Sequence, residues 1–185
     1  MIIAISGTPG TGKTAVGRMV AKKLVAELVD VNILIKQRKM HFRLDKKRNT
    51  KIIDPKELDN AVQRMNGNIV VDSHISHLIK SDVLFVLRCR PDVLKKRLDN
   101  RGWNKKKVLE NAQAEILDEV MIEALQCKKA KRVFEIDTTK MGAKKIAGMI
   151  LRILKYFSSK RYAIGRYTPG RIDWSEKFKN MLTKG

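Results

Sequence analysis

The feature that most constrains the fold is the run Gly7–Thr14, which reads G-T-P-G-T-G-K-T and follows the apolar residues 1–6. It matches the pattern GxxxxGK[ST], in which glycines let successive backbone amides approach phosphate oxygens without an intervening Cβ atom. A helix that starts at Lys13 would direct the positive end of its dipole to the same point. The sequence therefore predicts a buried strand, a phosphate-binding loop and a helix in direct succession.

Single residues of this run have separate expected tasks. Lys13 is expected to reach the β- and γ-phosphates of ATP, and Thr14 to offer its hydroxyl to Mg²⁺. Gly10, Gly12 and Ala15 are expected to lie along the path of the phosphate chain. We therefore predict that ATP and Mg²⁺ bind here, with a glycine turn that holds no ligand as the alternative.

Strand-like and helical patterns alternate along most of the chain. Apolar, strand-like segments occupy residues 1–6, 28–34, 67–72, 81–89 and 131–137. Helical patterns occupy residues 13–27, 54–65, 90–100, 105–126 and 140–157, with Asp54 as an N-cap and prolines at two helix starts. Such alternation is typical of a parallel sheet with helices on both faces. We predict the α/β class, a doubly wound P-loop domain with five parallel strands over residues 1–157.

An acid and a histidine follow one buried segment, which reads I-V-V-D-S-H. Asp72 ends the segment at the edge where open parallel sheets hold ligands, so we expect it to hold Mg²⁺ through water. The alternative is a helix cap. His74 could orient or deprotonate an attacking water, or position an acceptor phosphate, although a lone histidine is usually structural. His77 and His41 have no comparable placement and are interpreted as incidental.

Two arginines precede a break in the helical pattern. Arg97 and Arg101 are followed directly by Gly102 and a lysine-rich stretch. A short arginine-bearing excursion between two helices suits a mobile lid, which would exclude water and bring guanidinium charge to the transferred phosphoryl group. Arg101 is the stronger candidate, since Arg97 could lie on a helix surface. The alternative is a basic helix–helix hairpin.

The chain is strongly basic, with 40 Lys and Arg against 19 Asp and Glu and a net charge of +21. This excess favours a polyanion partner, above all nucleic acid, because thermophile-like lysine enrichment usually brings matching glutamate.

The apolar runs are shorter than the ~20 residues that cross a bilayer, so we predict a cytoplasmic protein without a membrane anchor. Cys89 and Cys127 lie far apart, which indicates buried thiols in a reducing compartment and gives no zinc pattern.

Three stretches together resemble the nucleoside monophosphate kinases: GTPGTGKT, IVVDSH and RLDNRGWNKKKVLENAQAEI. More narrowly, about residues 1–155 are similar to the family of adenylate kinase isoenzyme six and its archaeal relatives. This resemblance implies adenylate kinase activity (ATP + AMP = 2 ADP), ATPase activity and a role in small ribosomal subunit and 16S rRNA maturation. It implies rRNA and the small-subunit protein uS11 as partners, and a monomer. It also implies catalytic roles for Lys13, Asp72, His74 and Arg101, an NMP-binding segment at about residues 28–51 and a lid at about residues 101–111.

The segment of residues 36–51 departs from that family, in which it is acidic and clasps the acceptor monophosphate. Here it contains eight Lys or Arg and one acid, Asp45. The family's arginine aligns with Lys36, and lysine does not provide bidentate phosphate recognition, so Arg38 or Arg43 could substitute. A solvated helix face and an arm that contacts RNA are the alternatives.

A basic, aromatic extension over residues 158–185 has no counterpart in the family core. It interleaves three aromatic residues with three arginines: Tyr162, Tyr167, Trp174, Arg161, Arg166 and Arg171. This interleaving suits stacking on unpaired bases together with phosphate contacts. The same residues could instead dock as an arm on the protein's own surface.

Two hypotheses from different classes remain. The first is a Mg²⁺-ATP-dependent kinase that transfers the γ-phosphoryl group to AMP, or to water when no acceptor is bound. The second is an RNA-associated assembly factor whose ATP cycle drives binding and release, with little kinase turnover. A passive RNA-binding module conflicts with the intact phosphate-binding pattern.

Overall fold

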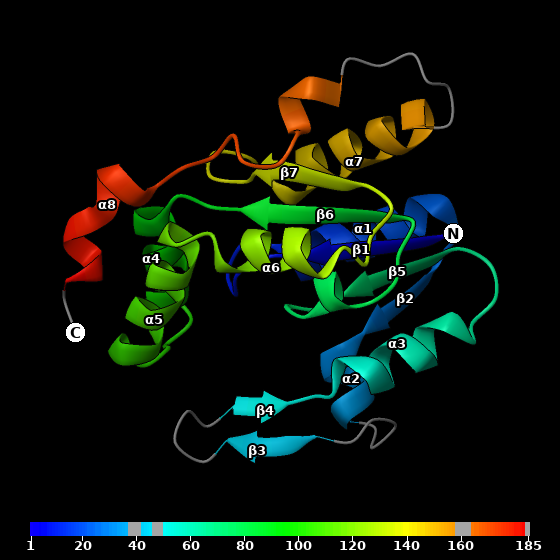
Figure 1. Cartoon of the computed structure of the whole chain (residues 1–185), viewed down its shortest axis with the longest axis horizontal. Coiled ribbons are helices and arrows are strands. Elements are labelled where there is room, and N and C mark those ends of the chain that lie inside the picture. Colours follow the sequence, from blue (N-terminus) through cyan, green and yellow to red (C-terminus); the bar gives the residue numbers. More distant parts are fainter. Residues whose placement is uncertain (37–41, 46–49, 158–163, 184–185) are drawn as a thin grey trace.

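A parallel sheet forms the centre of the fold in the computed structural model, which describes residues 1–36, 42–45, 50–157 and 164–183. Its strands are β1 (Ile2–Ser6), β2 (Glu27–Asp30), β5 (Ile69–Asp72), β6 (Val83–Arg88) and β7 (Val133–Asp137). They lie in the order β2-β5-β1-β6-β7, and all neighbours are parallel (Figure 1). The predicted α/β class with five parallel strands is confirmed. Because strand order reverses beside β1, the loop after β1 lies at the switch point where such sheets bind ligands.

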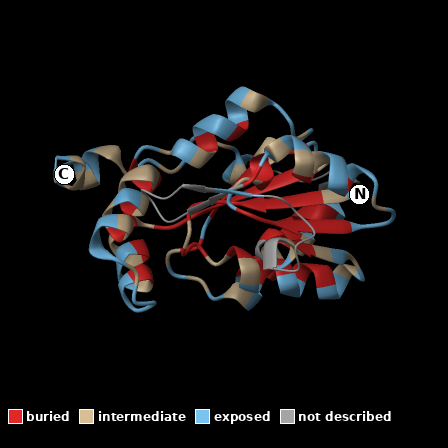
Figure 2. Cartoon of the chain, turned by 90° about the horizontal axis from the view of Figure 1, so that it is seen from below, coloured by how far each residue is buried: buried red, intermediate tan, exposed pale blue. Residues whose placement is uncertain are grey.

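Helices cover both faces of this sheet. The helices are α1 (Lys13–Leu24), α2 (Val31–Lys36), α3 (Pro55–Gln63), α4 (Pro91–Asp99), α5 (Lys105–Ile116), α6 (Glu119–Cys127), α7 (Ala143–Phe157) and α8 (Ser175–Leu182), and the last of these packs against α5. Successive strand residues alternate between faces: Ile3 and Ile5 pack with α1 and α7, whereas Ala4 packs with α6. Figure 2 shows buried residues along the sheet and on the inner sides of the helices. Every helix in the described part of the chain is too short or too polar to cross a bilayer.

The second predicted strand is shorter than the sequence indicated. Residues 28–34 were expected to be strand, but β2 ends at Asp30 and the helix α2 begins at Val31. Asp30 lies opposite Asp72, the last residue of β5, so the pairing partner ends there. The Asp30 carboxylate also accepts a hydrogen bond from the Ile33 amide at 3.4 Å, as an N-terminal helix cap does. The prediction of strand beyond Asp30 was therefore wrong.

The predicted helix at residues 105–126 is two helices, α5 and α6. Asp118 separates them with a left-handed φ of 56°. Its carboxylate forms an ion pair with the buried guanidinium of Arg88. The helix is therefore interrupted at the residue that forms this ion pair, and the spacing of apolar residues does not predict such a pair. The two helix starts that were predicted at prolines are confirmed, because α3 begins at Pro55 and α4 begins at Pro91. Asp54 is the N-cap of α3, and its carboxylate accepts a hydrogen bond from the Lys56 amide at 2.8 Å.

The predicted lid begins as a tight turn between α4 and α5. Gly102 has a φ of 72°, and Asn104 caps α5 by accepting a hydrogen bond from the Lys106 amide at 2.8 Å. Residues 105–111 of the expected lid are therefore helical, as the alternative of a basic helix–helix hairpin requires. That this segment moves as a lid stays a prediction.

The described part of the C-terminal extension docks on the domain. The Arg171 amide donates to Glu135 on β7 at 3.0 Å, and Gln113 on α5 donates to the Met181 carbonyl at 2.9 Å. In Figure 1 the segment crosses from β7 to α4 and α5, and α8 lies beside these two helices. The docking alternative therefore holds for residues 164–183, whereas Arg161 and Tyr162 lie outside the described residues. An RNA contact by the extension stays a prediction.

Candidate functional site

The phosphate-binding loop lies between the end of β1 and the start of α1. Gly7, Gly10 and Gly12 have φ values of 136°, 95° and 99°, a region that favours glycine. A Cβ atom at Gly7 would lie 2.3 Å from the Leu87 carbonyl oxygen, which only a shift of β6 could relieve. A Cβ atom at Gly12 would meet no atom within 4 Å. Gly7 thus permits close packing against β6, while Gly12 borders open space in which a ligand can approach the backbone.

Lys13 supplies a buried cation at the base of this loop. Its ammonium donates hydrogen bonds to the carbonyls of Gly7 at 2.7 Å and Thr8 at 3.2 Å. Burial lowers its pKa to about 8, although the nearby carboxylates of Asp72 and Glu115 act in the opposite direction. The ammonium is thus mainly charged at neutral pH, but its charge is poorly solvated because the group is buried. An anion on the loop would stabilise it.

Asp72 and Thr14 meet beside Lys13. Asp72 ends β5 next to Ile5 of β1 and is 2% exposed. One of its oxygens interacts with the Thr14 hydroxyl, while Oδ2 is buried with no hydrogen-bond partner among the described residues. Burial, first of all, raises the pKa of this carboxyl. A buried carboxylate oxygen without a partner, next to a hydroxyl, is a donor set that fits Mg²⁺.

Asp30 is a further acid at this edge that the sequence analysis did not single out. It lies opposite Asp72 at the end of β2, is buried, and its charge contributes to the raised pKa of Asp72. The signal was present, since Asp30 ends an apolar strand as Asp72 does. Two carboxylates therefore end neighbouring strands beside the loop.

His74 lies two residues beyond Asp72 and is exposed. Desolvation by the surrounding protein atoms, and then the positive charges of Lys13 and His77, lower its pKa to about 4. The imidazole is therefore neutral at pH 7. A neutral ring can accept a hydrogen bond from a water or hydroxyl. His74 therefore remains a candidate for placing an acceptor.

His77, interpreted as incidental from the sequence, is a buried structural residue. Its Nδ1 lies 2.9 Å from the Ser6 hydroxyl and its Nε2 lies 2.8 Å from the Glu123 carboxylate. Ser6 is also 3.1 Å from the His74 carbonyl oxygen. His77 thus links β1, α6 and the loop that carries His74. Sequence spacing could not reveal this link, because Glu123 is distant along the chain.

Arg97 and Arg101 line one cavity of about 180 Å³ above the loop, together with Gly10 and Gly12. Arg97 donates to the carbonyl of Thr138 at 3.1 Å and more weakly to that of Gly10 at 3.4 Å, so it is tied to the loop rather than free on a helix surface. Arg101 is exposed, and its charge acts on Lys13. An apolar part of the lining comes from Met141 and from Ala143 and Ile146 of α7. The cavity therefore combines two cations with apolar side chains.

A buried ion network supports the loop from behind. Arg88 is 2% exposed and donates to Glu115 at 2.8 Å and to Glu135 at 2.6 Å. Glu115 in turn accepts a hydrogen bond from Thr8 of the loop and another from the Cys89 amide at 3.0 Å. Burial opposes the charge of Arg88, but its carboxylate partners raise its pKa overall. Local sequence patterns do not predict this network, because its members are spread over β6, α5 and β7.

The predicted acceptor-binding residues are described only in part. A two-stranded hairpin, β3 (Arg43–Asp45) with β4 (Thr50–Ile52), projects below β2 and α2 in Figure 1. Arg43 is exposed on β3. Arg38 and the Lys36 side chain lie outside the described residues. A solvated helix face was one alternative for residues 36–51, but β3 and β4 within this segment are strands. Monophosphate binding by this segment stays a prediction.

Two further residues of the predicted phosphate path lie at the loop. Ala15 is exposed in the first turn of α1, and Gly10 lines the cavity. Both cysteines are free: Cys89 is buried and Cys127 is half-buried. Burial raises the pKa of the Cys89 thiol to about 11, so it is an inert core residue.

Comparison with known proteins identifies the family. Residues 3–118 match the model of a family described as an AAA domain. The chain is 35% identical to a Methanocaldococcus jannaschii protein named "Putative adenylate kinase", across 99% of this chain and 98% of the relative. A protein of the same name from Methanosarcina acetivorans is 38% identical, across 94% and 97%. The chain belongs to this archaeal adenylate kinase family, within the nucleoside monophosphate kinase superfamily.

The match to the archaeal adenylate kinase family corrects one expectation. Because the M. jannaschii alignment covers 99% of this chain, it includes most of the extension at residues 158–185, which was expected to lack a counterpart. Solved structures agree on the fold. Deoxyadenosine kinase from M. mycoides has a TM-score of 0.57 at 17% identity, over 85% of this chain and 100% of that chain. Shikimate kinase from Acinetobacter baumannii has a TM-score of 0.60 at 17% identity, over 87% and 95%.

Replacing Glu115 with Gln should weaken both the fold and nucleotide binding. The change leaves the buried guanidinium of Arg88 without one of its carboxylates, which costs about 3 kcal/mol of unfolding free energy. It also weakens the acceptor that holds Thr8, so the Kd for ATP should rise. Urea unfolding and calorimetric titration measure the two effects. Glu110→Gln, an exposed position on the same helix, is the control and should change stability by less than about 0.5 kcal/mol. Equal stabilities of the two variants would contradict the role of the network.

ATP binding should take up protons near pH 8, where about half of the Lys13 side chains are neutral in the free protein. The phosphates favour the charged form and raise this pKa, so about half a proton enters per nucleotide. Titration calorimetry in two buffers of different ionisation enthalpy measures the uptake. Lys13→Arg should abolish it, because arginine stays charged, whereas Lys23→Arg at the exposed end of α1 should preserve it. No uptake by the wild-type protein would contradict the lowered pKa.

Proposed function

We propose that the protein is a Mg²⁺-dependent adenylate kinase that transfers the γ-phosphoryl group of ATP to AMP, and to water when AMP is absent. The observation that carries the proposal is the buried ammonium of Lys13, held between the phosphate-binding loop and the partly unsatisfied carboxylate of Asp72. The names of the archaeal relatives support an adenylate acceptor.

The loop would bind the phosphates of ATP through the backbone amides before α1, where the helix dipole adds positive potential. Lys13 would exchange its contacts with the Gly7 and Thr8 carbonyls for phosphate oxygens, which offset its burial better than neutral carbonyls do. Thr14 and Asp72 would hold Mg²⁺. When bound, this ion supplies Lewis-acid stabilisation of charge on the phosphate oxygens.

The arginines would act on the transferred group and on the nucleoside. Arg97 and Arg101 line the cavity above the loop, where guanidinium charge stabilises the charge that develops on the phosphoryl oxygens. Met141, Ala143 and Ile146 form the apolar part of its lining, which suits the face of a purine base.

The acceptor would enter from the side of β2, α2 and the hairpin. Arg43 on β3 supplies one cation there, and Lys36 and Arg38 are further candidates for the monophosphate. His74 lies on the same side of the loop, at the end of β5. Its neutral ring would accept a hydrogen bond from the attacking hydroxyl or water and so orient it.

Lys13→Ala should abolish both AMP phosphorylation and ATP hydrolysis, with a loss of at least about 100-fold in kcat, because it removes the only buried cation at the loop in the described chain. A coupled assay of ADP formation, with and without AMP, measures both reactions. Lys23→Ala, at an exposed position on the same helix, should leave both rates near wild type. Survival of either reaction in Lys13→Ala would contradict the assignment.

A second candidate function is an RNA-associated ATPase that acts in small ribosomal subunit maturation, with uS11 and rRNA as partners. The net charge of +21 favours it, because a metabolic kinase needs no such excess.

The two candidates differ in the ratio of reactions. AMP phosphorylation and ATP hydrolysis should be measured with and without a fragment of 16S rRNA or the protein uS11. A kinase should prefer AMP over water under all conditions. Hydrolysis that rises at least about tenfold with RNA or uS11, with poor use of AMP, would favour the assembly ATPase and reject the kinase.

A further inference from the structure

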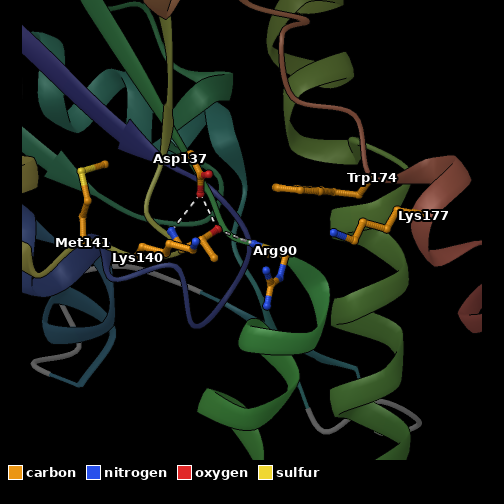
Figure 3. A pocket seen from close by; sticks show the side chains of 7 residues that line it. Arg90, Asp137, Lys140, Met141, Trp174 and Lys177 are labelled. Atoms are coloured by element: carbon orange, nitrogen blue, oxygen red, sulfur yellow. Dashed lines mark hydrogen bonds between the residues drawn. The ribbon is translucent and has the colours of Figure 1, made fainter.

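A second cavity lies beside the first, where the C-terminal extension docks. It has a volume of about 280 Å³ and is lined by Thr139 and by the residues that Figure 3 labels: Arg90, Asp137, Lys140, Met141, Trp174 and Lys177. Two elements of the domain, the ends of β6 and β7, form one wall. The extension forms the other wall through Trp174 and Lys177. We call this cavity the Trp174 pocket.

The Trp174 pocket lies close to the proposed nucleotide cavity but apart from the acceptor side. Met141 lines both cavities, so they adjoin at this residue. The Trp174 pocket lies beside β7 at one edge of the sheet, whereas β2 and the β3–β4 hairpin lie at the other edge. A ligand in the Trp174 pocket would therefore not be the acceptor monophosphate of the proposed reaction.

Positive charge predominates around the Trp174 pocket. Arg90, Lys140 and Lys177 line it, and the one acid in the lining is Asp137. Arg90 pairs with Asp92 at 2.6 Å, and Asp137 accepts a hydrogen bond from the Thr139 amide at 2.8 Å. The two lysines are exposed and form no ion pair in the described part of the chain. The Lys177 ammonium lies over the Phe178 ring, 6.0 Å from its centroid, a weak contact that an anion can replace.

Trp174 gives the pocket an aromatic wall and an unsatisfied donor. Its ring extends from the extension toward the end of β7, with Arg90 on the other side of the space (Figure 3). Phe178 supports the ring edge-on, with centroids 6.3 Å apart. The indole Nε1 is buried and has no hydrogen-bond partner among the described residues. Since buried donors in folded proteins are almost always paired, this N–H indicates a missing acceptor.

We propose that the Trp174 pocket is a second nucleotide subsite, in which a nucleobase stacks on Trp174 and a phosphate lies near Lys140 and Lys177. An aromatic face with adjacent cations is the arrangement by which proteins hold unpaired nucleotides. The nucleotide is either free or part of single-stranded RNA, since both carry the same chemistry.

Fluorescence of Trp174 tests this proposal. The chain has two tryptophans, so Trp103→Phe leaves Trp174 as the single reporter. With the phosphate-binding loop saturated by ADP and Mg²⁺ omitted to prevent phosphoryl transfer, the protein is titrated with AMP and, separately, with a short oligouridylate. Stacking should quench the fluorescence saturably. Lys140→Ala combined with Lys177→Ala should weaken the affinity about tenfold by removing both phosphate contacts.

Lys144→Ala combined with Lys179→Ala is the matched control, because these exposed lysines lie outside the lining on α7 and α8. It should retain wild-type affinity. Unfolding curves that coincide for all variants exclude a general loss of structure. The same quenching is expected in Lys13→Ala, so a failure of the catalytic proposal and a failure of this one are distinguishable.

The outcomes separate the two sources of the nucleotide. Oligouridylate that binds at least about tenfold more tightly than AMP supports single-stranded RNA, whereas equal or tighter binding of AMP supports a free nucleotide. Absence of quenching by both probes overturns the proposal. Quenching that the Lys140 and Lys177 substitutions weaken no more than the control substitutions also overturns it.

Discussion

The buried ammonium of Lys13 is the interaction on which the rest of the site depends. Its charge is retained against burial by two loop carbonyls and by the nearby carboxylates of Asp72 and Glu115. The charged form of Lys13 is only weakly favoured in this arrangement, because burial lowers its pKa to about 8. The phosphates of a nucleotide would improve it, while the left-handed glycines leave the backbone amides accessible to them. On the proposed function, the desolvated Lys13 cation would therefore favour the binding of a polyphosphate.

Three parts of the chain meet at Arg88, behind this loop. Glu115 connects the guanidinium to Thr8, Asp118 pairs with it from the turn between α5 and α6, and Glu135 joins it to the Arg171 amide of the C-terminal extension. Such a buried ion network specifies one arrangement, because each charge is costly without its partners. The extension is therefore continuous with the structure that supports the loop, and it also forms one wall of the Trp174 pocket.

Local patterns predicted most of the fold. Apolar runs gave five strands, and glycine spacing gave the loop with Lys13 and Thr14, because both depend on residues adjacent in sequence. Contacts between residues far apart in sequence could not be predicted. β2 ends at Asp30, which pairs with the last residue of β5, Asp72. The predicted helix at residues 105–126 is divided at Asp118, which forms an ion pair with Arg88. The sequence pattern likewise could not show that Arg97 reaches the carbonyls of Gly10 and Thr138, because these residues lie far from it along the chain.

The most direct test of the central claim is a crystal structure with Mg²⁺ and a non-hydrolysable ATP analogue. We expect the β- and γ-phosphates to lie against the amides of Gly10–Thr14 and Lys13 to leave the Gly7 carbonyl for phosphate oxygens. We also expect Asp72 Oδ2 to gain a partner in the shell of the metal ion. Phosphates bound elsewhere, with Lys13 still on the Gly7 carbonyl, would contradict this claim.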